Sequence, residues 1–477
     1  MRINRKHFII RSAAGAACLS AGSILPGFIT GVSNSDRDIR SHNNVNQGSF
    51  GCTGSGHIKK TPELLPDKIA GMTLEELRDD YRNRIFNQYL PFWEKGGYDS
   101  DLGGFMCELD DDGRVVIDEK YIWYQARGIW VYSFLYNNFG REGKFLDIAG
   151  KSRDFMVKNM YLGNGVWRES VDRQGNPVKS MVSQGSSNDI YGALFSAAGL
   201  IELYKANGNR DDLTIALDSV RASAEAYESP DYEGIVVPGI NRKGLRTIGH
   251  SFMFVWILGN LLSFLNDRNL KELQDEHINH ILNDFWNPEY GISNENLYHD
   301  YSRLPGYEST MYSGHYLETL WMVLQEALRR HDAGLFETVK MRIRRLIGMT
   351  WDYVFEGMGT EEYYVFSGEG KCQGPDFSIK VMWAHTELLI ATMMILEHTG
   401  EMWALEWYER GREYCLRTMA NTGTGVWRQA VDRYGNDMKR PEISIYRKDN
   451  FHQIRYMMMN CLSLERMIRN RRRPGKI

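Results

Sequence analysis

The chain has 477 residues, of which 43% are hydrophobic and 25% are charged; these proportions are ordinary for a folded globular protein and exclude a wholly disordered chain. The 57 Lys and Arg residues nearly balance the 61 Asp and Glu residues, for a net charge of −4, whereas nucleic-acid-binding proteins carry a clear basic excess. We therefore expect no nucleic-acid partner, and six cysteines without a Cys-x-x-Cys pair indicate neither a structural zinc site nor a dense disulfide framework.

Residues 1–31 have the pattern of an export signal. A basic start around Arg5 precedes an apolar stretch of small residues that runs to Ile29, as in a signal peptide. The segment Asn4–Ile9 is close to a twin-arginine signal, with Lys6 where the second arginine would stand. We therefore predict export, with the periplasm as the destination.

Residues 32–67 differ in composition from the rest of the chain. They are rich in Ser, Asn, Gly and Asp, which is typical of a flexible spacer. Cys18 and Cys52 each offer a position for a lipid anchor, although neither follows a leucine-led lipobox. No later apolar stretch is long enough to cross a bilayer, so we expect no integral membrane span in the mature chain.

From residue 68 onwards the dominant pattern is helical. Apolar residues recur at i, i+3, i+4 and i+7 in windows that Gly, Pro, Asn and Asp separate, and this spacing predicts amphipathic helices. Twelve such windows indicate six helical hairpins closed into a ring, an all-α domain over residues 68–471 followed by a basic tail at residues 472–477. The windows are 73–94, 121–139, 143–160, 188–206, 211–228, 249–266, 270–284, 313–330, 335–354, 378–399, 402–419 and 448–469.

Short segments between some helices carry a different signature. The segment Gly165–Asn176 contains Gly-Val-Trp-Arg followed by Val-Asp-Arg-x-Gly-Asn, and Gly425–Asn436 repeats it 260 residues later. A looser copy runs from Gly103 to Gly113. Alternating residues that end in Asp-x-x-Gly predict β-hairpins, and a repeat of this kind favours one repetitive domain over two unrelated ones.

A ladder of polar residues occurs near the start of every second predicted helix. In a ring of six hairpins these helices form the inner wall, and their N-termini, which favour negative charge, point to one end. Successive members of the ladder are 61 to 70 residues apart. They are Arg127, Asn188, His250, His315, His385 and His452.

The ladder indicates proton-transfer chemistry. Because histidine titrates near neutrality, a facing pair can remove a proton on one side of a carbon and return it on the other, as epimerisation or aldose–ketose isomerisation requires. Arg127 is placed to hold an oxygen on which enolate charge develops. Glu318 and Glu387 lie within one helical turn of His315 and His385, and we expect them to orient imidazoles or bind hydroxyls.

Three other uses of these residues stay open. His-x-x-Glu on a helix can supply two metal ligands, although six separate helices around a wide funnel argue against convergence on an ion, and we predict no metal. An exported glycoside hydrolase would need two carboxylates across the scissile bond, for which Asp189, Glu318 and Glu387 are available. The last alternative is a carbohydrate-binding protein without activity.

At these residues the sequence resembles the N-acylglucosamine 2-epimerase family, which includes cellobiose 2-epimerases and related sugar isomerases. The resemblance covers most of residues 70–470, and it implies an (α/α)6 barrel that acts without a redox cofactor or an essential metal. Its motifs occur in the family's order. They are Gly103-Gly104-Phe105, Gln125–Trp130, Gly249–Met253, Gly314–Glu318, Trp383–Glu387 and Phe451–Arg455.

The resemblance also assigns roles. It implies that His315 and His452 exchange the proton at C2 of the opened sugar and that Arg127 stabilises the enediolate oxygen. Together with the ladder, it predicts a second set of residues that bind and orient the substrate. These are His250, Glu318, His385, Glu387, Asn188, Trp383 and Arg455.

His385 and the Gly-His pair at His250 favour the N-acylglucosamine branch of the family over the cellobiose branch. The predicted reaction therefore interconverts N-acyl-D-glucosamine and N-acyl-D-mannosamine. The expected partner is a small-molecule sugar substrate. An aldose–ketose isomerase and a disaccharide 2-epimerase on the same scaffold remain alternatives, as does a homodimeric assembly.

Overall fold

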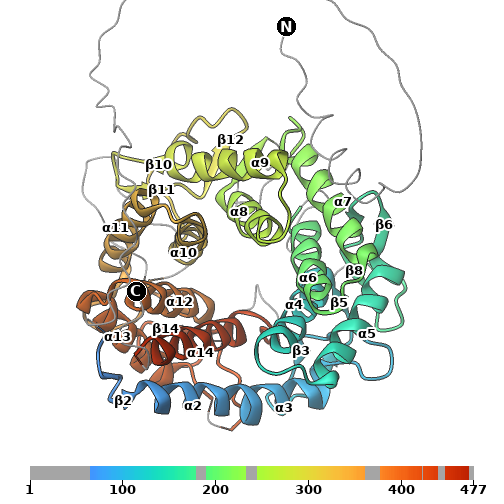
Figure 1. Cartoon of the computed structure of the whole chain (residues 1–477), viewed down its shortest axis with the longest axis horizontal. Coiled ribbons are helices and arrows are strands. Elements are labelled where there is room, and N and C mark those ends of the chain that lie inside the picture. The colour runs from blue at the N-terminus through green and yellow to red at the C-terminus, as the bar shows by residue number, and fades with distance from the viewer. Residues whose placement is uncertain are drawn as a thin grey trace, which may run out of the picture.

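The computed structural model describes residues 65–178, 190–232, 244–359, 377–421, 423–438 and 446–471. Two layers of helices form a ring (Figure 1), so the predicted all-α (α/α)6 barrel is confirmed. The inner layer consists of α4 (Ile122–Asn138), α6 (Tyr191–Asn207), α8 (Ile248–Leu262), α10 (Ser313–Arg330), α12 (Met382–Thr399) and α14 (His452–Arg471). The outer layer consists of α2 (Leu74–Arg84), α5 (Gly143–Met160), α7 (Arg210–Tyr227), α9 (Arg268–Asn279), α11 (Ala333–Thr350) and α13 (Met402–Thr418).

The two layers differ in how much of each helix is buried. Most residues of α12 are buried around its whole circumference, because the helix is covered on both sides. On α9 the buried residues Leu270, Gln274, His277 and Ile278 form a single stripe, as expected of a helix with one face in water. None of the described helices combines the length and the hydropathy needed to cross a bilayer.

Three predicted helical windows contain more than a single α-helix in the structure. The window 73–94 is divided into α2, the π-helical turn η3 (Ile85–Tyr89), the short α3 (Leu90–Phe92) and a second π-helical turn, η4 (Trp93–Gly97). Pro91 lies in α3, and proline removes a donor and clashes with the preceding turn. A third π-helical turn, η5 (His280–Asp284), extends α9, and the window 378–399 begins with the strand β13 (Ile379–Val381) before α12.

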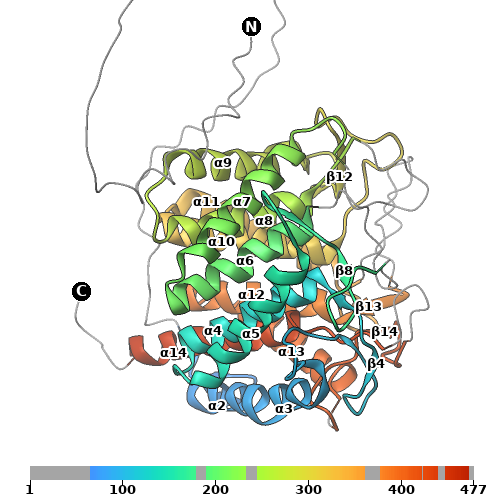
Figure 2. The same ribbon diagram turned by 90° about the vertical axis from the view of Figure 1, so that its right-hand side faces the viewer.

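Short two-stranded sheets gather at one end of the ring (Figure 2). Three of them tie the residues just before an inner helix to a later loop. These pairs are β5 (Lys120–Tyr121) with β8 (Ser170–Val171), β9 (Leu245–Thr247) with β12 (Asn296–Tyr298), and β13 with β14 (Ala430–Asp432). The others at this end are β3 (Glu108–Leu109) with β4 (Val115–Ile117), β6 (Tyr161–Gly163) with β7 (Val166–Trp167), and β10 (Trp286–Asn287) with β11 (Ile292–Ser293). The pair β1 (Lys68–Ile69) with β2 (Met72–Thr73) lies at the opposite end, where Arg471 in the last turn of α14 binds the Leu65 carbonyl.

The predicted repeat is therefore real, but its strands pair differently from simple hairpins. Val171 and Val431 each bridge a residue just beyond the Asp-x-x-Gly-Asn turn, Pro177 and Asp437 respectively. The longer pairing joins each strand to the segment that leads into α4 or α12. Each turn therefore forms only one bridge of its own, and β8 and β14 make their other backbone pairings with β5 and β13.

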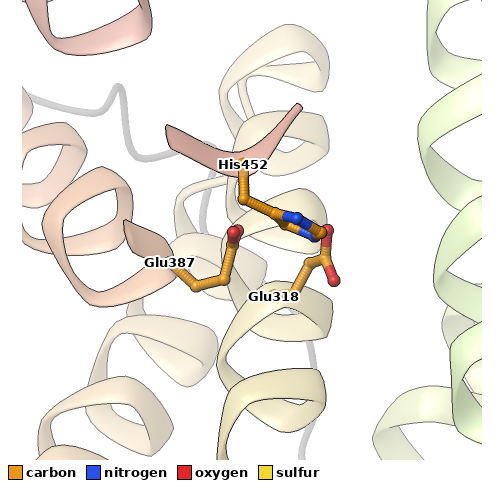
Figure 3. A group of neighbouring side chains, drawn as sticks. All are labelled: Glu318, Glu387 and His452. Atoms are coloured by element: carbon orange, nitrogen blue, oxygen red, sulfur yellow. The ribbon is translucent and has the colours of Figure 1, made fainter. Parts of the chain in front are cut away.

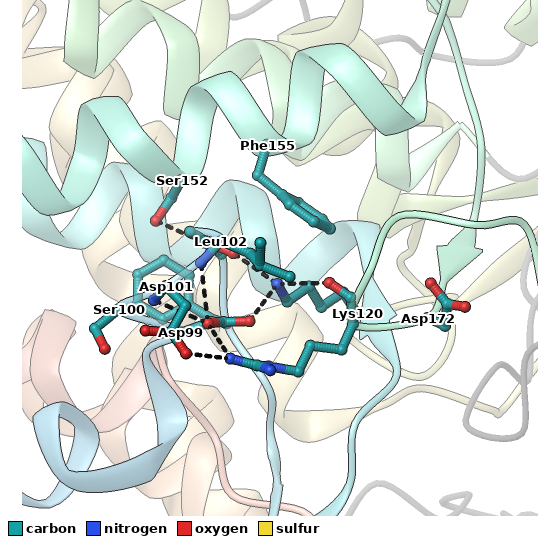
Figure 4. Close-up of polar contacts among 12 residues, drawn as sticks. Asp99, Ser100, Asp101, Leu102, Lys120, Ser152, Phe155 and Asp172 are labelled. Carbon is teal, nitrogen blue, oxygen red and sulfur yellow. Dashed lines mark hydrogen bonds and ion pairs between the residues drawn. The ribbon is translucent and has the colours of Figure 1, made fainter.

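A buried ion-pair cluster accompanies each copy of the repeat. Lys120 Nζ lies 2.9 Å from Asp99 Oδ2 (Figure 4), and Arg173 Nη2 lies 2.8 Å from Asp99 Oδ1. In the second copy, 260 residues later, Lys380 Nζ lies 3.2 Å from Asp352 Oδ2, which also accepts a hydrogen bond from the guanidinium of Arg433. Both lysines stand two residues before an inner helix, so each cluster ties the segment that leads into α4 or α12 to a neighbouring loop.

Candidate active site

The strand-bearing end of the barrel opens into a cavity of ≈ 470 Å³. Its wall combines inner-helix residues with the β13–β14 sheet and the loops beside it. The inner-helix residues are Trp123, Arg127, Tyr191, Phe195, Phe252, His315, Glu318, Trp383 and His452. The cavity therefore lies where the sequence predicts that the polar ladder converges.

The structure brings some of the predicted site residues together and separates others. Arg127, His315, His452, Glu318 and Trp383 line the cavity. Four others are fully or almost fully buried and are not among the lining residues: His250, His385, Glu387 and Arg455. The predicted binding residue Asn188 lies outside the described part of the chain.

His315 is held at the start of α10 by a carboxylate from another element. Its Nδ1 donates to Glu295 Oε1 at 2.9 Å, and Glu295 lies between β11 and β12. The imidazole centroid is 5.1 Å from the ring centroid of Trp383, which lies in the first turn of α12. His315 therefore faces the cavity with its ring orientation fixed by Glu295 and its position limited by Trp383.

His452 has a similar arrangement and lies near the same indole. Its Nδ1 donates to Asp449 Oδ2 at 2.7 Å, and its ring centroid is 5.7 Å from that of Trp383. Burial opposes ionisation of Asp449, but the charge of His452 and its hydrogen bond outweigh it, so the pKa of the Asp449 carboxyl falls well below its usual range. Asp449 is therefore a carboxylate at neutral pH.

Arg127 brings a positive charge into an aromatic corner of the cavity. Its guanidinium carbon is 4.3 Å from the ring centroid of Phe195 and 5.3 Å from that of Phe451, within the range of cation–π attraction. Nη1 is 4.0 Å from Asp449 Oδ2, and Nε has no hydrogen-bond partner among the described residues. Burial lowers the pKa of Arg127, although an arginine remains charged at neutral pH.

Beneath the cavity, a buried arginine joins two carboxylates. Arg455 Nη2 donates to Glu318 Oε1 at 2.7 Å and to Glu387 Oε1 at 2.6 Å, and Trp321 Nε1 donates to the other oxygen of Glu387 at 2.7 Å. Burial raises the pKa of Glu387, whereas for Glu318 the positive charges of Arg455 and His452 overcome the burial effect and lower its pKa. Glu318, which reaches the cavity, therefore ionises at a lower pH than Glu387.

The same floor contains the candidate metal-ligand group of the described residues. One ligand atom each from Glu318, Glu387 and His452 lies within 4.8 Å of the others, and the three side chains point toward one another (Figure 3). Both carboxylates already bind the guanidinium of Arg455, so a metal ion would compete with a buried cation that is part of the fold.

His385 and His250 lie behind the wall. His385 Nδ1 donates to the Val381 carbonyl at 2.7 Å, and Nε2 accepts the Met358 backbone N–H at 2.9 Å. Burial lowers the pKa of His385 to about 4, so the ring is neutral near pH 7 with both nitrogens occupied by backbone. The Nδ1 of His250 meets the Tyr232 hydroxyl, and its ring packs 4.2 Å from that of Tyr191.

Sequence reasoning did not identify Glu295 and Asp449. Asp449 stands three residues before His452, a spacing that can bring both side chains together at a helix start, so a local signal existed. Glu295 is 20 residues from His315, in the connection between β11 and β12, and no helical or strand period relates the two positions. Only the tertiary fold brings that pair together.

Comparisons with known proteins identify the fold and the family. A family model described as N-acylglucosamine 2-epimerase (GlcNAc 2-epimerase) matches residues 103–452. The N-acylglucosamine 2-epimerase of Mus musculus is 26% identical over 360 residues, which cover 72% of this chain and 81% of that protein. The cellobiose 2-epimerase of Dictyoglomus turgidum is 26% identical over 285 residues, covering 55% and 68% of the two chains.

Among solved structures, the cellobiose 2-epimerase from Bacillus thermoamylovorans B4167 has a TM-score of 0.69 at 18% identity, and the match covers 82% of this chain and 100% of that one. A D-mannose isomerase has a TM-score of 0.63 at 13% identity, covering 83% and 97%. These likenesses show the shared barrel. The family model spans the cavity residues from Arg127 to His452, and the chain belongs to the N-acylglucosamine 2-epimerase family.

Proposed function

We propose that the protein is a sugar 2-epimerase that interconverts N-acyl-D-glucosamine and N-acyl-D-mannosamine. The observation that carries the proposal is the pair of cavity-lining imidazoles, His315 and His452, each bound through Nδ1 to a buried carboxylate and each packed near Trp383. Two such bases are what proton exchange on both faces of one carbon requires. The curated N-acylglucosamine 2-epimerase relatives support the choice of substrate.

The two histidines account for both proton transfers of the reaction. With the sugar in its open form, one neutral imidazole accepts the C2 proton, and the electron pair of that C–H bond forms the C1–C2 double bond of an enolate. Arg127 faces the oxygen that gains negative charge. The other histidine, as imidazolium, donates its proton to the opposite face of C2, and the aldehyde is restored. No electrons leave the substrate, so the step needs no redox partner.

A disaccharide 2-epimerase is the second candidate. The cavity of ≈ 470 Å³ is also lined by Trp427, Arg428 and Tyr446 beyond the inner helices, and these groups could cover a second sugar unit. The cellobiose 2-epimerase of Dictyoglomus turgidum is a curated relative that supports this reading.

Proton NMR in D2O tests the reaction and selects the substrate. The protein is incubated separately with N-acetylglucosamine, N-acetylmannosamine, mannose, glucose, cellobiose and mannobiose. We expect deuterium at C2 together with the epimer for an N-acylated sugar, and loss of at least about 10³-fold in rate for His315→Ala and His452→Ala. A ketose product would indicate an isomerase instead, and C2 exchange only with disaccharides would favour the second candidate. Epimerisation that leaves C2 unlabelled would contradict the proposal.

We also infer export of the chain, on the basis of the signal-like pattern in residues 1–31, which lie outside the described residues. Expression with a C-terminal epitope, followed by cell fractionation, tests this. The chain expressed with residues 1–31 should be recovered outside the cytoplasm, and a form expressed without them should remain inside it.

A further inference from the structure

The ring of inner helices closes beside one buried carboxylate. Arg127 on α4 and His452 at the start of α14 come from the first and last inner helices, yet both reach Asp449. Its Oδ2 accepts from His452 Nδ1 at 2.7 Å and lies 4.0 Å from Arg127 Nη1. Asp449 is 9% exposed. One carboxylate thus touches two of the three residues that the proposed reaction uses.

Asp449 is itself held firmly. Its Oδ1 accepts the backbone N–H groups of Phe451 at 2.9 Å and His452 at 2.6 Å, and its carbonyl accepts the Tyr89 hydroxyl at 3.0 Å. The next residue, Asn450, donates to the Tyr124 carbonyl on α4 at 2.9 Å. The start of α14 is therefore fastened to the helix that carries Arg127, and the carboxylate has little freedom to follow either partner.

The contact decides which imidazole nitrogen can act as a base. In a neutral imidazole one nitrogen donates and the other accepts a hydrogen bond, and an ionised carboxylate can only accept. Nδ1 of His452 must therefore carry the hydrogen, which leaves Nε2 as the basic nitrogen of a ring that lines the cavity. An amide in place of the carboxylate could donate to Nδ1 instead and would favour the opposite tautomer, in which Nε2 is blocked by its own hydrogen.

We propose that Asp449 is a positioning residue of the epimerase, which holds His452 in the Nδ1–H tautomer and sets Arg127 beside it. The proposal rests on the proposed function, because it explains how these two residues act on one substrate. Glu295 binds Nδ1 of His315 in the same way, from the connection between β11 and β12. Asp449 differs because its single carboxylate serves an acid–base residue and a charge-stabilising residue together.

The test compares Asp449→Asn with the unmodified protein. Asparagine caps a helix about as well as aspartate, so the start of α14 should persist and the urea midpoint should stay close to that of the unmodified protein. We expect kcat to fall by about 10² to 10⁴-fold, as for other changes of a carboxylate behind a catalytic histidine or metal ligand, with KM changed less than about threefold. Nitrogen-15 NMR of histidine-labelled protein should show the His452 ring shifting to the Nε2–H tautomer.

Asp267→Asn provides the matched control, because Asp267 caps the outer helix α9 through the N–H groups of Asn269 and Leu270 and should leave kcat and the His452 tautomer unchanged. Three results would overturn the proposal: an Asp449→Asn enzyme with kcat within threefold of the unmodified one, an unchanged tautomer, or a loss of kcat matched by a loss of folded protein. If the unmodified protein fails to exchange the C2 proton, the proposed function fails, while the tautomer measurement still reports whether Asp449 orients His452.

Discussion

At the scale of single residues, the histidines of the ladder separate into two environments. His315 and His452 line the cavity and each donates Nδ1–H to a carboxylate, which leaves one nitrogen for chemistry. His385 gives both nitrogens to backbone groups. Similar spacing in the sequence therefore places identical side chains in different chemical settings, and the predicted binding role of His385 remains a prediction that its surroundings do not favour.

The low pKa of His385 leads to a prediction about stability and pH. Because its folded-state value of about 4 lies below the value near 6.5 of an unfolded chain, the unfolded state binds the extra proton, and stability falls as the pH drops through this interval. Between pH 7 and pH 5, His385 should account for a loss of about 2 kcal/mol in the free energy of unfolding. Urea unfolding at both pH values measures it.

The comparison uses His385→Gln, which has no titrating ring and should lose correspondingly less stability over the same interval, whatever its absolute stability. His331→Gln, at an exposed histidine, should keep the pH dependence of the unmodified protein. Equal losses in the His385→Gln and unmodified chains would show that the ring is not held neutral by burial.

At the scale of elements, close packing between inner helices positions the cavity aromatics. Gly314 near the start of α10 lies against α12, and a Cβ at this position would be 2.5 Å from the indole of Trp383 and 2.9 Å from the Cβ of Ala384. Because Trp383 packs near both His315 and His452, the absence of a side chain at Gly314 affects the geometry of both imidazoles.

Gly314→Ala should therefore move the Trp383 ring and lower kcat/KM at least about tenfold, although alanine is a better helix former than glycine by about 1 kcal/mol. Steady-state epimerase rates together with tryptophan fluorescence measure the two effects. Gly334→Ala on the outer helix α11, where the nearest atom to the added Cβ is 3.5 Å away, should change neither. A Gly314→Ala enzyme of unaltered kcat/KM would show that Trp383 does not set the histidine geometry.

At the scale of the whole molecule, the barrel closes through contact between the ends of its sequence. α2 packs on α14 (Figure 1), and the Tyr81 and Tyr408 hydroxyls meet at 2.5 Å between α2 and α13. Arg412 Nη2 on α13 donates to Asp80 at 2.8 Å. Since α14 carries His452, the closure that completes the core also completes the cavity.

This predicts that damage to α2 destabilises the entire ring. Leu77→Ala, at a fully buried position of α2, should lower the free energy of unfolding by about 2 to 5 kcal/mol, with far-ultraviolet circular dichroism and tryptophan fluorescence reporting one common transition. Met341→Ala, at a side chain that is 54% exposed, should change stability by less than about 0.5 kcal/mol. An early separate transition for Leu77→Ala, with the rest of the barrel intact, would contradict a closed cooperative ring.

Local patterns were enough to predict the helices. The windows 143–160 and 313–330 coincide with α5 and α10, because apolar periodicity and the Gly or Asp residues at helix ends act over a few residues. The same reasoning missed the π-helical turns after α2 and the strand before α12, since these depend on Pro91 in its packed context and on pairing with a segment about 50 residues away.

The sequence by itself determined the all-α barrel, the family and the residues Arg127, His315, His452, Glu318 and Trp383 that the cavity contains. It did so because periodicity and motif order are properties of neighbouring residues. The tertiary structure alone decided that Glu295 backs His315, that Arg455 joins two buried carboxylates, and that His385 lies behind the wall. These facts depend on distances between side chains from different helices, which ring closure sets and no local spacing encodes.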